Sequence, residues 1–203
     1  MNRKQISPTV VKTDRKSLSG LDFKSAQTFE GQGLIPFAWM PRLLEELALD
    51  GVDIDQVGIA YQFETWIDER AGGPDEYRLR FHIWGDLPLI CQKCLSVYSE
   101  TLDEEAQFQL LETEEEVESF PLDDEFEDVL VNSAQFHLLD VIEDEILLSI
   151  PLMPRHPEKC PIASKNGENS QKNGEKSSNL DENEEIGKKP NPFEILKKMK
   201  FDI

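Results

Sequence analysis

The residues best suited to chemistry are the three cysteines and one of the three histidines. Cys91 and Cys94 are separated by Gln and Lys, and a turn of this spacing can direct two thiolates to one metal ion. A zinc site needs about four ligands. His156 and Cys160 lie four residues apart in a proline-rich loop and can supply the other two. The sequence therefore predicts a closed structural zinc site with ligands Cys91, Cys94, His156 and Cys160.

Two other interpretations of the cysteines remain open. The thiols could be buried or exposed without binding a metal, or the Cys91–Cys94 pair could serve as a thiol redox sensor. A thioredoxin-like motif lies between a strand and a helix, whereas the flanks of this pair have the composition of strands. Three cysteines cannot form a closed set of disulfides, and such a count is typical of a reducing compartment.

The sequence contains none of the common catalytic motifs. It lacks a glycine-rich phosphate loop, a nucleophile elbow and a His-Glu-x-x-His pattern, and its acidic residues are too many to single out a catalytic pair. We therefore expect a protein that is not an enzyme. The alternative is a metal-dependent enzyme that acts on RNA at Cys91 and Cys94. That activity needs an open coordination position, which four protein ligands would fill.

The elements that must position these residues follow from the apolar periodicity. Residues 57–67 and 77–83 alternate as two strands of an antiparallel hairpin, 107–111 predict a third strand, and Pro88 restricts 87–91 to an edge or a bend. Residues 41–49 and 138–150 predict helices. Trp66 and Trp84 fall on the face of the hairpin opposite its apolar residues, so we expect a partner or a helix to cover them. The predicted fold class is α+β, a small antiparallel sheet with two or three helices.

Composition divides the chain into four parts. Residues 1–30 predict a polar, weakly ordered arm, and 31–162 a single α+β domain with an acidic solvated loop at 112–128. Residues 163–187 predict a disordered polar linker because they are rich in Asn, Ser, Gly, Glu and Lys. Residues 188–203 predict a short basic amphipathic tail.

The distribution of charge indicates which partners are compatible. The net charge is −20, and residues 100–145 contain 18 Asp or Glu and no Lys or Arg. Such a segment repels phosphate over a Debye length of about 8–10 Å. Residues 1–30 and 188–203 each carry a local charge of +3. A basic protein is therefore one possible partner, and RNA held only by these two segments is another, although basic tails are often simply solvated.

The sequence predicts a cytoplasmic protein. No apolar run is long enough for a membrane-spanning helix, and the basic residues near the start are not followed by the apolar stretch of a secretory signal.

Three segments together resemble one known family. They are 138–156 followed by Cys160, the Cys-Gln-Lys-Cys-Leu run 91–95, and the Asn-Pro-Phe-Glu-Ile-Leu-Lys-Lys run 191–198. In this order they resemble the YceD family, the large ribosomal RNA subunit accumulation proteins, over roughly residues 30–160 and the tail. The resemblance implies a bacterial, cytoplasmic, non-enzymatic protein that supports synthesis, processing or stability of large-subunit (23S) ribosomal RNA. The partners that it implies are ribosome assembly components, either a basic ribosomal protein or the large-subunit rRNA.

Overall fold

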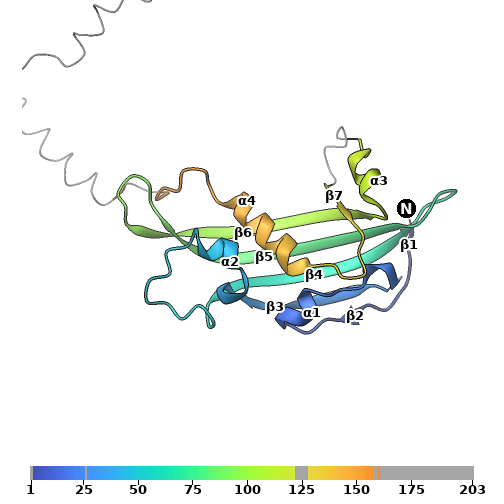
Figure 1. Ribbon diagram of the computed structural model, residues 1–203, viewed down its shortest axis with the longest axis horizontal. Coiled ribbons are helices and arrows are strands. Elements are labelled where there is room, and N and C mark those ends of the chain that lie inside the picture. The colour runs from blue at the N-terminus through green and yellow to red at the C-terminus, as the bar shows by residue number, and fades with distance from the viewer. Residues whose placement is uncertain (1, 26, 122–127, 158–159, 161–203) are drawn as a thin grey trace, which may run out of the picture. The chain divides into compact units, whose positions relative to one another are not determined.

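One mixed sheet forms the centre of the computed structural model, which describes residues 2–25, 27–121, 128–157 and 160 (Figure 1). The sheet has seven strands, and six of them follow the order β2-β3-β4-β5-β6-β7, while β1 pairs with β4. The strands are β1 (Asn2–Arg3), β2 (Thr9–Val10), β3 (Phe29–Pro36), β4 (Gly58–Glu69), β5 (Glu76–Ile90), β6 (Val97–Leu111) and β7 (Asp128–Val131). The helices are α1 (Arg15–Leu18), α2 (Pro41–Leu44), α3 (Glu114–Glu118) and α4 (Leu138–Ser149), with 3-10 turns at Phe23–Ser25 and Phe37–Trp39.

The α+β class is confirmed, but the sheet is larger than predicted and is not purely antiparallel. The β2–β3 and β6–β7 pairs are parallel. The predicted hairpin is present, since β4 pairs antiparallel with β5 and places Phe63 opposite Phe81. The predicted third strand is much longer than 107–111. Its acidic half was missed because only Tyr98 and Leu102 of that half are buried apolar residues.

Pro88 lies in β5 at a position where its missing N–H costs no hydrogen bond to a neighbouring strand. The last pair between β4 and β5 joins Ala60 and Trp84, so only β6 accompanies β5 beyond that point. The carbonyl of Pro88 accepts a hydrogen bond from Ala48 N at 2.8 Å and therefore points away from β6. The predicted edge position is confirmed, since the nitrogen of Pro88 faces the same way as its carbonyl and needs no strand partner.

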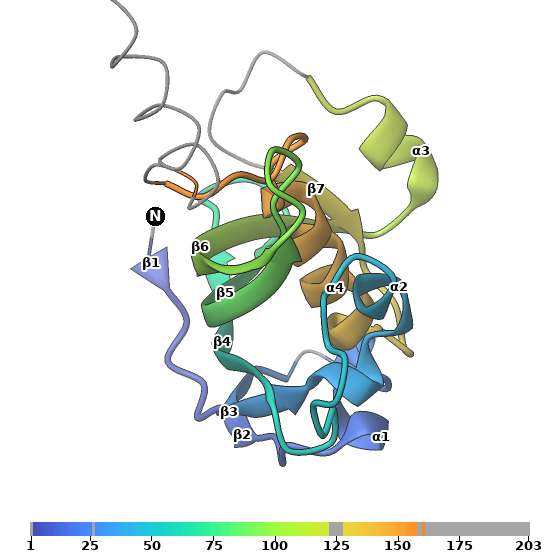
Figure 2. The ribbon, with the colours of Figure 1, turned by 90° about the vertical axis from the view of Figure 1, so that its left-hand side faces the viewer.

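The core lies between one face of the sheet and the helices. Figure 2 shows α2 and α4 on the same side of the sheet. Helix α4 confirms the helix predicted at 138–150, and its apolar residues fall on one face because they recur at intervals of three and four. They pack with the inward residues of β4 and β5 in one buried cluster, which includes Leu138, Leu139, Ile142, Ile146, Ile59, Tyr61, Phe63, Leu79, Phe81 and Ile83. The predicted helix 41–49 is shorter in the structure and ends at Leu44.

The first thirty residues differ from the weakly ordered arm that their composition predicts. Leu18, Leu21 and Phe23 are buried in the core. The ring of Phe23 lies 4.6 Å from that of Phe136, and Leu21 exchanges backbone hydrogen bonds with Phe136. A few large apolar side chains therefore fix a mostly polar segment to the sheet, because each one buries a large area.

The remaining predictions on domain organisation lie outside the described residues. The linker 163–187 and the tail 188–203 both lie beyond the last described residue, Cys160. Part of the acidic loop, 122–127, is also outside. None of the described helices is long and apolar enough to cross a membrane.

Candidate metal centre

The first two candidate ligands lie in the tight turn between β5 and β6. Cys91 N donates to Ser96 O at 3.0 Å, and Leu95 N donates to Cys91 O at 2.8 Å. Leu95 has a φ of +59°, in the left-handed region that non-glycine residues seldom adopt. The turn folds the chain back within a few residues and brings Cys91 and Cys94 to the same side.

The other two ligands come from the segment that follows α4. Pro151 ends that helix because it has no N–H to continue the hydrogen-bond pattern. Pro154 O then accepts a hydrogen bond from Gln92 N at 2.8 Å, which fastens the segment beside the turn. The ring of His156 packs against Tyr98 with centroids 5.1 Å apart. These two contacts place His156 and Cys160 opposite the cysteine pair.

The four side chains form one cluster whose ligand atoms all lie within 4.8 Å of one another. Cys91 Sγ is 3.7 Å from Cys160 Sγ, and His156 Nδ1 is 3.5 Å from Cys94 Sγ and 3.8 Å from Cys160 Sγ. A tetrahedral zinc ion with bonds of about 2.3 Å to sulfur and about 2.0 Å to nitrogen has sulfur–sulfur edges of about 3.8 Å and sulfur–nitrogen edges of about 3.5 Å. The donor set and its spacing therefore fit a zinc ion.

Burial and charge in the cluster also favour a cation. Cys91 and Cys160 are buried, and Cys94 is half-buried. Burial raises the pKa of Cys91, but hydrogen bonds from His156 and from the N–H groups of Cys94 and Lys93 outweigh it and lower the pKa to about 5. Burial and contacts with the other two thiols raise the pKa of Cys160 to about 11. Three thiolates at this distance repel one another, and a dication would remove that repulsion.

The structure thus brings together all four residues that the sequence predicts as ligands, while metal binding itself stays a prediction. Sequence reasoning missed the residues that support them. Ser96 Oγ lies 3.1 Å from Cys94 Sγ, and Tyr98 supports the His156 ring. Neither residue belongs to a recognisable pattern, since each acts through a contact that only the folded hairpin creates.

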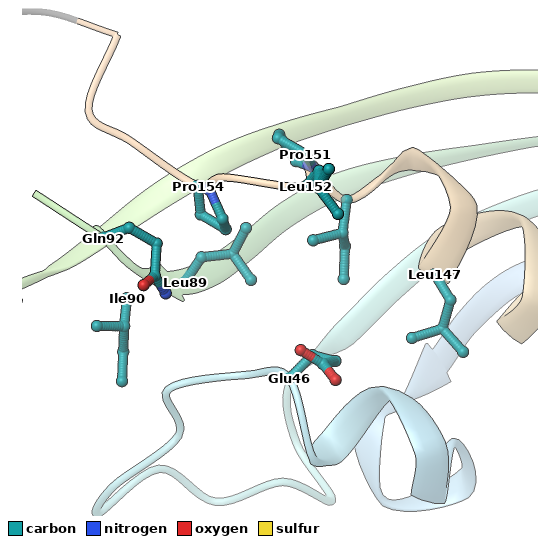
Figure 3. A pocket seen from close by; sticks show the side chains of 9 residues that line it. Glu46, Leu89, Ile90, Gln92, Leu147, Pro151, Leu152 and Pro154 are labelled. Carbon is teal, nitrogen blue, oxygen red and sulfur yellow. The ribbon is translucent and has the colours of Figure 1, made fainter. Parts of the chain in front are cut away.

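A groove lined mostly by apolar residues lies where Gln92 of the β5–β6 turn meets Pro154 of the segment after α4 (Figure 3). Its volume is about 410 Å³, and its walls are the ends of α4 and β5 and the loop that leads to the ligands. Among the described residues that line it, Glu46 alone is charged, and the others are Leu89, Ile90, Gln92, Leu147, Ile150, Pro151, Leu152 and Pro154. The same Gln92–Pro154 hydrogen bond that supports the cluster joins two walls of this groove.

Trp66 and Trp84 lie on the outer face of the sheet, which is the face opposite α2 and α4. Trp66 is half-buried, and the guanidinium of Arg3 lies 4.5 Å from its ring centroid. Arg3 also pairs with Glu64 at 3.0 Å. Trp84 is 38% exposed, and its ring lies 4.7 Å from that of His82. The chain's own first strand therefore covers Trp66, in place of the helix or partner that the sequence predicts.

Comparison with known proteins assigns the family. The family model described as "Large ribosomal RNA subunit accumulation protein YceD" matches residues 79–200, more than half of the chain. The chain belongs to the YceD family. The match begins within β5 and includes β6, α4 and all four candidate ligands, whereas β1 to β4 precede it.

A relative in the same family gives a further measure of similarity. The large ribosomal RNA subunit accumulation protein YceD of Haemophilus influenzae is 30% identical over 117 residues, which cover 57% of this chain and 60% of the relative. The chain therefore spans less than two thirds of that YceD protein's length. No solved structure matches the chain.

Proposed function

We propose that this YceD family member is a non-enzymatic accessory factor that supports the accumulation of large-subunit ribosomal RNA by binding a basic ribosomal protein. The family's name supports the ribosomal part of the proposal. The observation that carries the binding mode is the concentration of negative charge, 18 acidic residues and no Lys or Arg over 100–145. A basic surface is the natural complement of such a segment, and attraction between them would make association fast and sensitive to salt.

The described surface shows how closely these charges approach one another. Glu145 on α4 is half-buried, and its pKa is raised by that burial and by the charges of Asp128, Asp144 and Glu104. These residues come from α4, β6 and β7, so three elements contribute to one acidic surface. Phosphate would be repelled there. The competing proposal, direct contact with large-subunit rRNA, would have to use the basic segments at the two ends of the sequence.

We further propose that Cys91, Cys94, His156 and Cys160 hold a structural zinc ion. Two thiolates from the β5–β6 turn and a thiolate and an imidazole from the segment after α4 complete a tetrahedral shell. Zinc bound in this way supplies a crosslink between two chain segments and leaves no position for a water molecule. This arrangement supports a structural role and weighs against the alternative of a metal-dependent enzyme.

Metal analysis and cobalt spectroscopy test the zinc proposal. The purified protein is expected to contain one equivalent of zinc, and cobalt substitution should give the intense thiolate charge-transfer bands of a three-sulfur, one-nitrogen site. Cys94→Ser and Cys160→Ser should each lower the metal content, whereas His137→Gln, which changes an exposed histidine away from the cluster, should not. A metal-free protein whose Cys91 and Cys160 join in a disulfide on mild oxidation would instead support the thiol redox sensor.

Affinity capture at two salt concentrations tests the proposed function. The tagged protein is incubated with bacterial lysate, with and without ribonuclease, and bound proteins and RNA are identified. We expect large-subunit ribosomal proteins, recovered also after ribonuclease treatment and depleted at high salt. Recovery that disappears with ribonuclease would favour rRNA as the direct partner. Recovery that does not change with salt would contradict the electrostatic binding mode.

A further inference from the structure

The outer face of the sheet already binds one arginine of its own chain. The guanidinium of Arg3 lies over Trp66, with 4.5 Å to the ring centroid, and its Nη2 is 3.0 Å from Glu64 Oε2. Arg80 binds the other oxygen of the same carboxylate. Burial raises the pKa of Glu64, but the hydrogen bonds and the charges of Arg3 and Arg80 outweigh burial, so the pKa lies below its ordinary value. On this face, a tryptophan ring and a neighbouring carboxylate thus bind one guanidinium group together.

The same combination recurs further along the face at Trp84. Strand pairing places Asp103 of β6 directly opposite Trp84, and Asp86 follows two residues later on the same face of β5. His82 packs against one side of the indole and contacts Asp103 Oδ1 through Nε2 at 2.7 Å. The side chain of Asp103 is nevertheless 74% exposed. Within the described part of the chain, no Lys or Arg forms an ion pair with Asp86 or Asp103.

The charge on this face selects among possible ligands. Glu30, Glu64, Asp86, Asp103 and Glu105 lie on the outward side of β3 to β6. The arginines on this side, Arg3, Arg78 and Arg80, each already form an ion pair with a carboxylate of the chain. Nucleic acid is disfavoured, because its phosphates would face a surplus of carboxylates. A guanidinium fits best, since it stacks flat on an indole and donates to carboxylates in two directions, whereas an ammonium ion is a compact, strongly hydrated charge.

We propose that Trp84, Asp86 and Asp103 bind an arginine side chain of a basic protein segment. This inference rests on the proposed function, because it specifies where and how the basic partner would be recognised. The exposed Leu34 of β3 borders the site, because Leu34 pairs with Ala60 and Ala60 pairs with Trp84. Leu34 offers an apolar contact for the methylene groups of the bound arginine.

Titration with defined peptides tests the site on the full chain. The three tryptophans give three indole N–H resonances in a spectrum of protein labelled at tryptophan, and Trp84→Leu identifies one of them. A peptide of alternating arginine and glycine should shift the Trp84 resonance at low salt, and the matched lysine peptide should bind more weakly. Trp84→Leu and Asp103→Asn should each lower the affinity for the arginine peptide by about two- to fivefold.

Glu45→Gln is the matched control, because Glu45 is exposed at the end of α2, on the side of the sheet opposite Trp84 and outside the acidic segment 100–145. It removes the same charge and should leave the arginine affinity nearly unchanged. Equal binding of the two peptides, an unmoved Trp84 resonance, or an equal loss in Glu45→Gln would overturn the proposal. Thermal unfolding of each variant separates lost binding from lost folding.

The outcomes also separate this site from the proposed function. If affinity capture recovers basic ribosomal proteins equally with the wild type and Trp84→Leu, the function stands and the arginine site is wrong. If the arginine peptide binds at Trp84 but no basic ribosomal protein is recovered, the site stands and the proposed partner class is wrong.

Discussion

Helix α2 depends on a carboxylate from another helix, which makes Glu143 the most informative residue for a test of stability. Helix α2 has no side-chain cap of its own at Met40. Glu143 of α4, which is 3% exposed, instead accepts hydrogen bonds from Arg42 N at 2.7 Å and Leu43 N at 3.0 Å. The same carboxylate also pairs with the Arg42 guanidinium at 2.9 Å. One side chain therefore caps α2 and joins it to α4.

The cost of Glu143→Ala follows from these contacts. The N–H of fully buried Leu43 would lose its partner with no access for water, which costs about 1–3 kcal/mol. The loss of the charged bond to Arg42 N adds about 1.5–3 kcal/mol. The Arg42 side chain is 49% exposed and keeps Asp144, so its contribution is below about 1 kcal/mol. We expect a decrease in the free energy of unfolding of about 3–5 kcal/mol.

Urea denaturation followed by circular dichroism measures this loss. Asp144→Asn is the matched control, because it removes the neighbouring carboxylate that contacts the same arginine at an exposed position. That variant should lose less than about 1 kcal/mol. If Glu143→Ala cost no more than Asp144→Asn, the account of α2 as a helix capped from α4 would be refuted.

Two further predictions concern the sheet and the acidic surface. A Cβ on Gly58 would lie 1.9 Å from Ile35 O. Gly58→Ala should therefore destabilise the β3–β4 pair by about 2 kcal/mol or more, measured by thermal unfolding. Gly20→Ala is the control and should not destabilise the protein, because its Cβ would meet nothing closer than 3.5 Å. Glu145→Gln should stabilise the protein by up to about 1 kcal/mol at neutral pH. Because the pKa of Glu145 is raised in the folded state, its ionised form opposes folding, and this penalty disappears as the pH falls below the ordinary value of 4.5. The gain should therefore be absent in urea titrations at low pH, and a gain that persists there would show that charge is not its cause.

The parts of the fold that the sequence predicts are those with a regular apolar period. The hairpin of β4 and β5 and the helix α4 each bury one face, so their residues repeat at intervals of two or of three and four. Strands β1, β2 and β7 have two to four residues, too few to show any period. The packing of Phe23 against Phe136 joins segments far apart in the chain, and no local pattern predicts it.

The candidate site was predictable to a different extent. The types and spacing of Cys91, Cys94, His156 and Cys160 suffice to nominate a ligand set, because few side chains bind zinc. The outer face could be recognised only in part. Alternation places Trp66 and Trp84 on it, but the contacts that distinguish them, Arg3 at one and Asp103 at the other, depend on the strand register.

The position of the four ligands explains why a crosslink is useful there. The pairing of β5 with β4 stops at Ala60 and Trp84, whereas the pairing of β5 with β6 continues to Ile90 and Val97. Its last part is thus a two-stranded ribbon, and an isolated two-stranded hairpin is at best marginally stable in water. Backbone hydrogen bonds from Ala48 to Pro88 and from Gln92 to Pro154 give some support. A metal that joins Cys91 to Cys160, 69 residues later, would also close a long loop.

Removal of the metal should therefore loosen the tip of the hairpin before the rest of the sheet. We expect hydrogen exchange of the zinc-loaded protein after addition of a chelator to accelerate at Cys91, Gln92 and Leu95, whose amides hold the turn and the loop. The amides of Tyr61 and Phe81, in the centre of the sheet, should keep their protection because the apolar core maintains β4 and β5 without the crosslink. Equal acceleration at all five positions would mean that the metal stabilises the whole domain. No acceleration at the turn would mean that the cluster holds its shape without a metal, and the structural role assigned to zinc would then be wrong.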